Sequence, residues 1–315
     1  MQIVATSQEQ VASALGQATQ AGTKVSGVDL RALNRVVEYT PEDLTVTVEA
    51  GLSFAQLQAR LAERRQWLPI DPPQPSEVSI WDLLKFNLSG PRRYGYGTIR
   101  EHLIGLKVAL ADGRLIRSGG KVVKNVAGYD LLKLFVGDRG TLGVAVEATF
   151  KVHPLPEAER FVQVACASPA EAGRIIEAVV ESPLTPRVLD LYRDNELRVV
   201  LGFAGAREEV DWQLGAASKM GIKENADLQY DSDIRGPAPV QQLSVLPSRL
   251  IETLERLQPA RFVSRAGNGV IYYSGAGATA GSSSEGRVTT SPATVQELTR
   301  RIKDTFDPKH VLPSL

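Results

Sequence analysis

The chain has 315 residues, a length that suits two domains or one domain with a large insertion. Lysine plus arginine and aspartate plus glutamate number 36 each, so no excess of positive charge supports binding to nucleic acid. The chain has one cysteine, Cys166, which excludes an internal disulfide and a self-contained iron–sulfur cluster.

No apolar run approaches the length of a membrane-spanning helix, and the N-terminus lacks a basic segment followed by an apolar one. We therefore expect a cytoplasmic protein without a transmembrane segment. Any association with a membrane would come through partners.

The first elements of the chain show clear helical and strand patterns. Residues 7–21 (SQEQVASALGQATQA) are typical of an amphipathic helix, with Ser7 at the N-cap and Gln10 at the capping-box position. Apolar and polar residues alternate over 44–51 (LTVTVEAG), which predicts a half-buried strand. Ser53 then begins a second predicted helix, FAQLQARLAERR.

A proline-rich connector, 68–79 (LPIDPPQPSEVS), suits neither a helix nor a strand. Beyond it, 102–110 (HLIGLKVAL) predicts a strand, and the Asp-Gly step at 112–113 predicts a hairpin to a partner strand. A short helix is expected around 130–135. The alternating run 143–154 (GVAVEATFKVHP) predicts a long strand.

The sequence HPLP at 153–156 marks an expected domain boundary, because prolines interrupt regular elements. The order strand, helix, strand, strand, helix that follows predicts an α+β sheet with helices on one face. The expected strands are 160–167, 187–193, 196–205, 260–267 and 269–274, and the expected helices are 169–181, 207–221, 247–257 and 293–308. The Gly/Ser/Ala-rich stretch 275–287 is expected to be a loop.

Glycine is concentrated in the apolar run 121–143 (KVVKNVAGYDLLKLFVGDRGTLG), at Gly128, Gly137, Gly140 and Gly143. Glycine inside a regular element costs about 0.5–1 kcal/mol relative to alanine. These positions therefore indicate turns with positive φ, or a group that approaches the backbone closely. Backbone N–H groups in such a turn can face a phosphate or carbonyl oxygen, although most turns of this kind are structural.

These segments resemble the FAD-binding (E) subunit of bacterial glycolate oxidase, in the vanillyl-alcohol oxidase/PCMH-type flavoprotein superfamily. The resemblance is carried in family order by 33–73, by 87–143, by RAGNGVIYY at 265–273 and by FDPKHVLP at 306–313. It implies an α+β fold: a PCMH-type two-subdomain FAD-binding fold followed by an α+β cap domain. Residues 1–152 would form the FAD-binding module and 155–315 the cap.

The resemblance also assigns cofactor-binding residues. Arg92 or Arg93 could pair with a pyrophosphate oxygen, and Lys124 could stabilise negative charge on a reduced flavin or a substrate carboxylate. Solvated surface charge is the alternative for each of these cations. The implied cofactor-binding residues are Pro72, Pro73, Ser89, Gly90, Arg92, Gly95, Gly97, Thr98, Lys124, Asn125, Gly128, Tyr129, Gly137, Gly140, Thr141, Gly143 and Val144.

Two departures from the family pattern concern the diphosphate of FAD. The Gly-rich pyrophosphate loop after the first helix is reduced to 22–27 (GTKVSG), so a covalent flavin link through that loop is not expected. Where the family has Gly-Gly, this chain has SIWDLLKF, with bulky Trp81 and Phe86. Losing several backbone contacts predicts non-covalent FAD binding that is micromolar or weaker, about −8 kcal/mol or less favourable.

No side chain stands out as a catalytic base or a metal ligand. His102 begins a predicted strand, His153 precedes a proline, and His310 lies near the C-terminus, so each is expected to be a surface or core histidine. No G-x-G-x-x-G follows a predicted strand, which argues against a nicotinamide dehydrogenase.

The resemblance implies a subunit of an FAD-dependent oxidoreductase that converts a 2-hydroxy acid such as glycolate to the 2-oxo acid. In this heteromeric complex, electrons would pass from flavin to an iron–sulfur subunit. The expected partners are flavoprotein D-like and iron–sulfur F-like subunits. The alternative is a non-catalytic scaffold that keeps the fold, has a degenerate FAD site, and holds those two subunits together.

Overall fold

The computed structural model describes residues 1–120, 131–236, 240–274 and 293–314. The glycine-rich stretch 275–287 lies outside these residues, as do Lys124, Asn125, Gly128 and Tyr129 of the implied site. The chain divides into two compact units, which are described separately. The first unit comprises Met1–Ser89, Thr98–Leu155 and Ser291–Leu315, and the second comprises Gly90–Gly97 and Pro156–Thr290.

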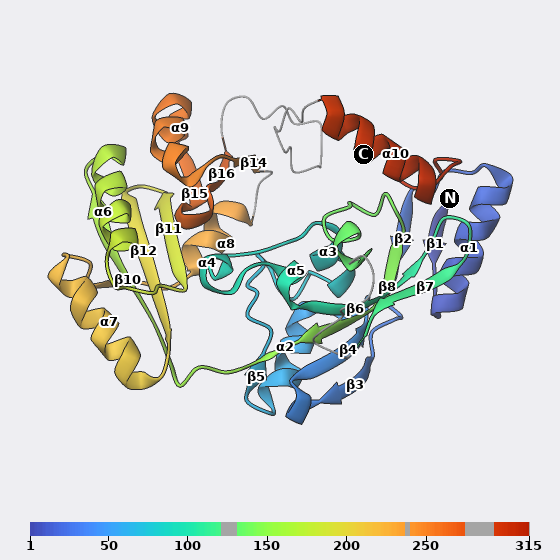
Figure 1. Cartoon of the computed structure of the whole chain (residues 1–315), viewed down its shortest axis with the longest axis horizontal. Helices are drawn as coiled ribbons and strands as arrows, with labels where there is room; N and C mark the ends of the chain where they lie inside the picture. Colours follow the sequence, from blue (N-terminus) through green and yellow to red (C-terminus); the bar gives the residue numbers. More distant parts are fainter. Residues whose placement is uncertain (121–130, 237–239, 275–292, 315) are drawn as a thin grey trace. The chain divides into compact units, whose positions relative to one another are not determined.

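The first unit is built on a five-stranded antiparallel sheet of order β3-β4-β8-β6-β7 (Figure 1). Its strands are β3 (Val36–Thr40), β4 (Thr45–Glu49), β6 (Leu103–Ala109), β7 (Leu115–Gly119) and β8 (Val144–Lys151). The predicted Asp-Gly hairpin is confirmed, since β6 pairs with β7 across it. Two small sheets pair β1 (Gln2–Val4) with β2 (Gly27–Asp29) and β5 (Gln66–Trp67) with β9 (His153–Pro154).

Several helices of the first unit begin at side-chain caps. The predicted N-cap Ser7 is confirmed, since its hydroxyl accepts the N–H of Gln10, and Ser53 forms a capping box with Gln56. Among the described residues, the helices of this unit are α1 (Gln8–Ala21), α2 (Phe54–Ala62), α3 (Ile80–Lys85), α5 (Ile99–His102) and α10 (Ala293–Phe306), with 3₁₀ turns at Pro41–Asp43 and Leu131–Leu134. No described helix combines the length and apolarity that crossing a membrane requires.

The two faces of the five-stranded sheet differ in polarity. Val46, Val48 and Phe150 belong to the core that also contains the apolar residues of α2 and α3. On the opposite face, the hydroxyls of Thr47 and Thr149 are 2.9 Å apart. This alternation is the period of two expected for strands with one apolar face.

The second unit is built on a seven-stranded antiparallel sheet of order β13-β10-β12-β11-β15-β16-β14 (Figure 1). Its strands are β10 (Ala158–Cys166), β11 (Val188–Arg193), β12 (Leu197–Gly205), β13 (Glu224–Asn225), β14 (Gln241–Ser244), β15 (Arg261–Arg265) and β16 (Val270–Ser274). Its described helices are α4 (Arg93–Tyr96), α6 (Pro169–Glu181), α7 (Arg207–Lys219), α8 (Gln229–Arg235) and α9 (Leu250–Leu257).

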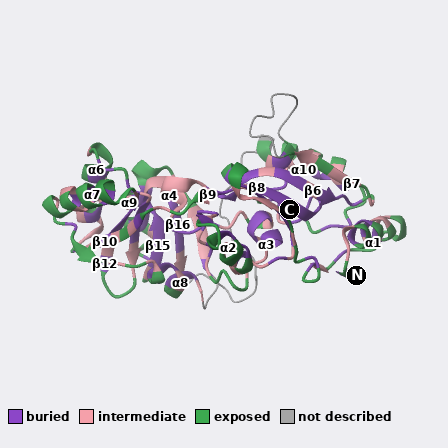
Figure 2. Ribbon diagram, turned by 90° about the horizontal axis from the view of Figure 1, so that it is seen from below, coloured by how far each residue is buried: buried purple, intermediate pink, exposed green. Residues whose placement is uncertain are grey.

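Helices cover both faces of this sheet, although the sequence predicted them on one. Leu189 and Leu191 share a core with α6, α7 and α9, whereas Val200 and Val263 pack with Tyr230 of α8 on the other face. The strands between them are largely buried, and the outer sides of the helices are exposed (Figure 2). The sequence predicted neither α8 nor the short strands β13 and β14.

The α+β fold class is confirmed. Two segments pack in a unit whose other residues are distant from them in the sequence: 90–97 in the second unit and 291–315 in the first. The Gly95 N–H donates to the Arg187 carbonyl at 2.9 Å within the second unit. In the first unit, the Val25 N–H donates to the Val311 carbonyl at 2.7 Å, and Phe306 of α10 contacts Phe135 edge to face. These contacts explain why neither unit is a continuous stretch of chain.

A matched pair of glycine substitutions tests the packing. A Cβ on Gly51 would lie 1.8 Å from the Leu30 carbonyl oxygen, whereas exposed Gly215 in α7 has open space around it. We expect Gly51→Ala to lower the free energy of unfolding by about 3 kcal/mol and Gly215→Ala to raise it by about 0.5–1 kcal/mol. Urea denaturation followed by circular dichroism measures both. Equal stabilities of the two variants would contradict the packing around Gly51.

Candidate functional site

The implied cofactor loop, residues 137–143 (GDRGTLG), leads directly into β8. Gly137, Arg139 and Gly140 have positive φ values of 79°, 59° and 73°, so the loop turns through left-handed conformations that glycine adopts without strain. A Cβ on Gly140 would also lie 3.2 Å from the ring of Trp81. The loop therefore has both a turn with positive φ and a group close to the backbone. The group that approaches Gly140 is the Trp81 side chain.

Most of the loop's backbone N–H groups already have acceptors. The Gly137 N–H donates to the Leu84 carbonyl and the Arg139 N–H to the Lys85 carbonyl, each at 2.9 Å. The Thr141 N–H donates to the Asp138 carbonyl at 3.1 Å. The N–H groups of Gly140 and Leu142 donate to the Asp138 carboxylate, at 2.9 and 3.2 Å. These five donors are satisfied without a ligand.

The helix α3 supplies the carbonyls that meet this loop. It begins at Ser79, which forms a capping box with Asp82, and Ile80, Leu83 and Leu84 are fully buried. Trp81 is 7% exposed. The sequence analysis noted the bulky residues here but missed the helix, although a serine three residues before an aspartate is a start signal.

Asp138 was not among the predicted site residues, and it organises the loop. It is 8% exposed, and burial raises the pKa of its carboxyl to about 7, although the two N–H donors and the charges of Lys85 and Lys303 act in the opposite direction. An aspartate that accepts N–H groups two and four residues further on is a local turn motif. The sequence GDRG was therefore the available signal.

A buried ion pair between Lys303 of α10 and Asp307, just after the helix, holds the other side of the loop. Lys303 donates to the Thr141 carbonyl at 2.8 Å and contacts the Asp307 carboxylate at 2.5 Å. Asp307 also accepts the N–H groups of Val311 and Leu312, each at 2.9 Å. The i, i+4 spacing predicts that the lysine and aspartate meet on a helix, but nothing local connects them to residue 141.

The other implied residues of the first unit occupy structural positions. Pro72 is buried and Pro73 half-buried in the connector before α3. Thr98 caps α5 through the Arg100 N–H, and Ser89 is buried. Val144 is the first residue of β8, and a Cβ on Gly143 would lie 2.7 Å from the Val108 side chain.

The implied residues Gly90, Arg92, Gly95 and Gly97 belong to the second unit. Arg92, one of the two arginines that could pair with a pyrophosphate oxygen, makes a two-point ion pair with Glu159, at 2.8 and 2.6 Å. A guanidinium that makes two parallel hydrogen bonds to a carboxylate has used the pair of donors that binds an anion most strongly. Of the implied residues of this loop, Ser89 and Thr98 are counted with the first unit and the other four with the second.

Two of the histidines meet in the first unit. The rings of His102 and His153 pack edge to face with centroids 5.2 Å apart. His102 is buried, and burial with the charge of Lys151 lowers the pKa of His153. His310 lies 3.2 Å from Asp304. These positions agree with the expectation of core and surface histidines.

Comparison with known proteins identifies the class of the first unit. Residues 11–119 match the family described as "FAD binding domain". This segment is therefore similar to FAD-binding domains, and the similarity supports FAD as the cofactor. The resemblance to glycolate oxidase subunits is confirmed by relatives that carry this name.

GlcE, a glycolate oxidase subunit of Escherichia coli, is 39% identical over 140 residues, which are 44% of this chain and 40% of that protein. GlcD, a glycolate oxidase subunit of Bacillus subtilis, is 33% identical over 172 residues, 55% of this chain and 37% of that protein. A D-lactate dehydrogenase of Saccharomyces cerevisiae is 30% identical over 186 residues, 59% of this chain and 31% of that protein. The chain thus matches well under half the length of each of these relatives.

A solved structure extends the likeness in fold to nearly the whole chain. An alkyldihydroxyacetonephosphate synthase superposes with a TM-score of 0.73, over 98% of this chain and 75% of the synthase, at 17% identity. At this identity the likeness concerns the fold alone. It supports the fold class expected from the sequence.

The described residues of the 137–142 loop, together with Arg92, leave few donors available to a cofactor. A diphosphate is held by N–H donors and cations that are free to accept its oxygens. Here the donors of the 137–142 segment are bound within the chain, and Arg92 is bound to Glu159. Trp81 also packs against Gly140 of this loop.

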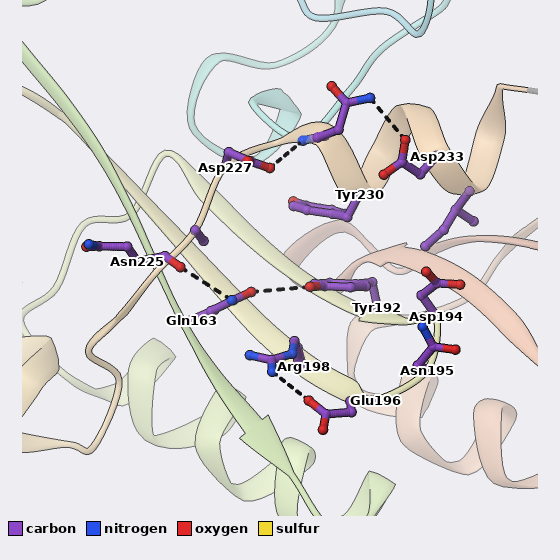
Figure 3. A pocket seen from close by; sticks show the side chains of 13 residues that line it. Gln163, Tyr192, Asp194, Asn195, Glu196, Arg198, Asn225, Asp227, Tyr230 and Asp233 are labelled. Atoms are coloured by element: carbon purple, nitrogen blue, oxygen red, sulfur yellow. Dashed lines mark hydrogen bonds and ion pairs between the residues drawn. The ribbon is translucent and has the colours of Figure 1, made fainter.

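A separate cavity of about 710 Å³ lies in the second unit, between the sheet and α8 (Figure 3). The rings of Tyr192 and Tyr230 stack on one side of it, with centroids 4.4 Å apart. Its charged lining consists of Asp194, Glu196, Arg198, Asp227 and Asp233. Four carboxylates against one guanidinium disfavour an anion, so this cavity does not suit a 2-hydroxy acid carboxylate.

Behind Tyr230, the second unit buries an ion network. Arg265 is fully buried and contacts the carboxylates of Asp190 and Asp231. The Tyr230 hydroxyl donates to Asp190 at 2.8 Å, and burial raises the pKa of that carboxyl to about 6 against the opposing charge of Arg265. These partners come from β11, β15 and α8, so no sequence spacing could have indicated them.

The raised pKa of Asp138 predicts a pH dependence of stability. Because its pKa is about 7 in the folded protein and 3.8 ordinarily, the folded state binds more protons between these values, and the free energy of unfolding falls as the pH rises. This group contributes at most about 4 kcal/mol to that loss, at about 1.4 kcal/mol per pKa unit. Urea denaturation across the range measures it.

Asp138→Asn should flatten this pH dependence, while Asp211→Asn, at an exposed carboxylate on α7, should leave it unchanged. Asp190 contributes in the same direction in both variants, so a residual slope is expected. An unchanged slope in Asp138→Asn would contradict the assignment.

The buried network of the second unit gives a further prediction. Arg265→Met leaves Asp190 buried without its cation and Asp231 paired with Arg235 alone, and we expect it to cost about 3–5 kcal/mol. Adding Asp190→Asn should restore part of this loss. Arg249→Met, which breaks an exposed pair with Glu252, should leave stability nearly unchanged. Thermal denaturation measures these stabilities. An equal loss of stability in Arg265→Met and Arg249→Met would contradict a stabilising role for the network.

Proposed function

We propose that the chain is a subunit of an FAD-dependent complex that oxidises a small 2-hydroxy acid, such as glycolate, to the 2-oxo acid. The observation that carries this proposal is the 39% identity over 140 residues with GlcE, which is by name a glycolate oxidase subunit. The match to GlcD supports it, because GlcD is also named as a subunit. The complex is proposed to act in the cytoplasm.

The chain is proposed to act with other subunits because oxidation removes two electrons that need an acceptor. One cysteine cannot hold an iron–sulfur cluster, so an F-like iron–sulfur subunit and a D-like flavoprotein subunit are the proposed partners. Within the chain, we assign residues 1–152 to the FAD-binding module and 155–315 to the cap. The proposed contacts of the FAD-binding module near the flavin ring are Lys124, Asn125, Gly128 and Tyr129.

A second candidate is a non-catalytic scaffold that keeps the fold and holds the D-like and F-like subunits together. A specific observation favours it: the donors of the glycine loop and the Arg92 side chain are bound within the chain. The acidic lining of the cavity beside Tyr192 also offers no cation for a substrate carboxylate, apart from Arg198. In this case, the partners perform the chemistry.

Flavin stoichiometry in a reconstituted complex separates the two candidates. The chain should be co-expressed with D-like and F-like subunits, purified through a tag on the chain, and assayed for glycolate-dependent dye reduction. Recovery of all three subunits with activity is expected. One FAD per D-like subunit indicates a scaffold, and an additional FAD per chain indicates a flavin-binding subunit. Recovery of the chain alone would contradict both candidates.

The matched control is the complex reconstituted without this chain. If the D-like and F-like subunits assemble and oxidise glycolate equally well in its absence, the proposed function is wrong.

A further inference from the structure

Arg187 lies where the helix α4 packs on the start of β11 in the second unit. The Gly95 N–H donates to the Arg187 carbonyl at 2.9 Å, and the Arg187 N–H donates to the Gly202 carbonyl at 2.6 Å. A Cβ on Gly95 would lie 2.6 Å from the Arg187 Cδ, so the aliphatic stem packs directly on this glycine. The guanidinium carbon lies over the Tyr96 ring, 5.4 Å from its centroid. Contacts with two neighbours thus hold the side chain in position.

These contacts leave the charge of Arg187 without an opposite charge. The residue is partly buried, and its Nε is buried without a hydrogen-bond partner. No hydrogen bond or ion pair joins its guanidinium to another described residue. Other buried arginines of this unit do contact carboxylates, as Arg92 contacts Glu159 and Arg265 contacts Asp190. Because an unpaired buried donor lowers stability, Arg187 has the character of a group whose partner is a ligand.

The charged groups that act on Tyr96 carry a net positive charge. Burial raises the pKa of the Tyr96 hydroxyl, and the charge of Arg187 lowers it. Glu159 raises the same pKa, and Arg92 lowers it. Since Arg92 and Glu159 neutralise each other in their ion pair, Arg187 supplies the remaining positive charge. An anion at this place therefore meets an unpaired cation.

The turn Ala266–Asn268 also packs against α4. A Cβ on Gly267 would lie 2.1 Å from the Tyr94 ring, so the two segments are in close contact. The Oδ1 of Asn268 is buried and has no hydrogen-bond partner in the described part of the chain. Two segments that pack on α4 thus each carry one unpaired buried polar atom, a donor on Arg187 and an acceptor on Asn268. Buried atoms of this kind normally have partners, which a bound polar molecule would supply.

We propose that Arg187 binds the carboxylate of the 2-hydroxy acid through its guanidinium, in a position fixed by Gly95 and Tyr96. A carboxylate accepts two parallel N–H donors from a guanidinium, a geometry that lysine does not provide. The inference rests on the proposed oxidation of a small 2-hydroxy acid, and it names the residue that recognises the charge of that acid. It also gives Gly95 a role, because a larger residue there would displace the stem of Arg187.

Arg193 is a matched control within the same unit. It is the last residue of β11, whereas Arg187 precedes the first. Its guanidinium carbon lies over the Phe262 ring at 5.9 Å, as that of Arg187 lies over a tyrosine. The surroundings differ, because Glu196 lines the same hollow of about 590 Å³ as Arg193. A carboxylate in this hollow disfavours an anion at Arg193.

NMR of the purified chain measures binding without activity. The Nε–H signals of the two arginines are assigned by their loss in Arg187→Lys and Arg193→Lys. Glycolate, added up to about 10 mM, should shift the Arg187 signal saturably and leave the Arg193 signal in place. Sodium chloride and ethylene glycol at the same concentration should shift neither signal. An Arg187 signal that does not move with glycolate, or that moves equally with chloride, would overturn the proposal.

Kinetics of the reconstituted complex test the same contact during turnover. Arg187→Gln removes the charge, and we expect the KM for glycolate to rise about tenfold or more with a smaller change in kcat, since the contact binds substrate and transition state alike. Arg187→Lys keeps the charge without the paired donors and should raise KM less. Arg193→Gln should leave both constants unchanged. An unchanged KM in Arg187→Gln would rule out this role.

The two measurements distinguish a failure of this inference from a failure of the proposed function. If the complex oxidises glycolate but the Arg187 signal or the KM does not respond, the inference is wrong and the proposed function stands. If the complex does not oxidise glycolate, the proposed function is wrong, and the titration of the unmodified chain still decides whether Arg187 binds the acid. If Arg187→Gln fails to fold, Arg187→Lys provides the kinetic comparison.

Discussion

The structure of the first unit depends on where the N–H groups of the glycine loop find acceptors. A buried donor without a partner costs about 1–3 kcal/mol, so a loop with five such donors requires either a ligand or the chain itself. Here α3 and Asp138 accept them, and α10 holds the loop through Lys303. The position of α3, the conformation of 137–142 and the attachment of the C-terminal helix are therefore linked through one set of hydrogen bonds.

Much of the fold could be predicted from the sequence because its signals are local. The cap at Ser7, the Asp-Gly hairpin and the alternating pattern of β8 each depend on neighbouring residues, and each is present. The glycines of the loop were also read correctly as turns with a close approach. What the sequence could not indicate is the group that approaches Gly140, because Trp81 is far from it along the chain.

The parts that were missed depend on contacts between distant segments. Residues 90–97 contain Arg92, and no local signal in the sequence indicated its ion pair with Glu159 of β10. Arg265 joins Asp190 and Asp231 across three elements of the second unit. Helix α3 was missed for a different reason: a six-residue helix carries too few apolar positions to show a period, although its capping box was visible.

In each unit, donors and charges of the kind that a ligand site keeps available are bound within the chain. A binding site holds donors or charges whose partners arrive with the ligand, and the protein gains stability when they do. In the first unit the loop donors are bound to α3 and Asp138, and in the second unit Arg92 and Arg265 are bound to carboxylates. The glycine loop of the first unit and the two arginines of the second are thus held in place by hydrogen bonds and ion pairs within the chain.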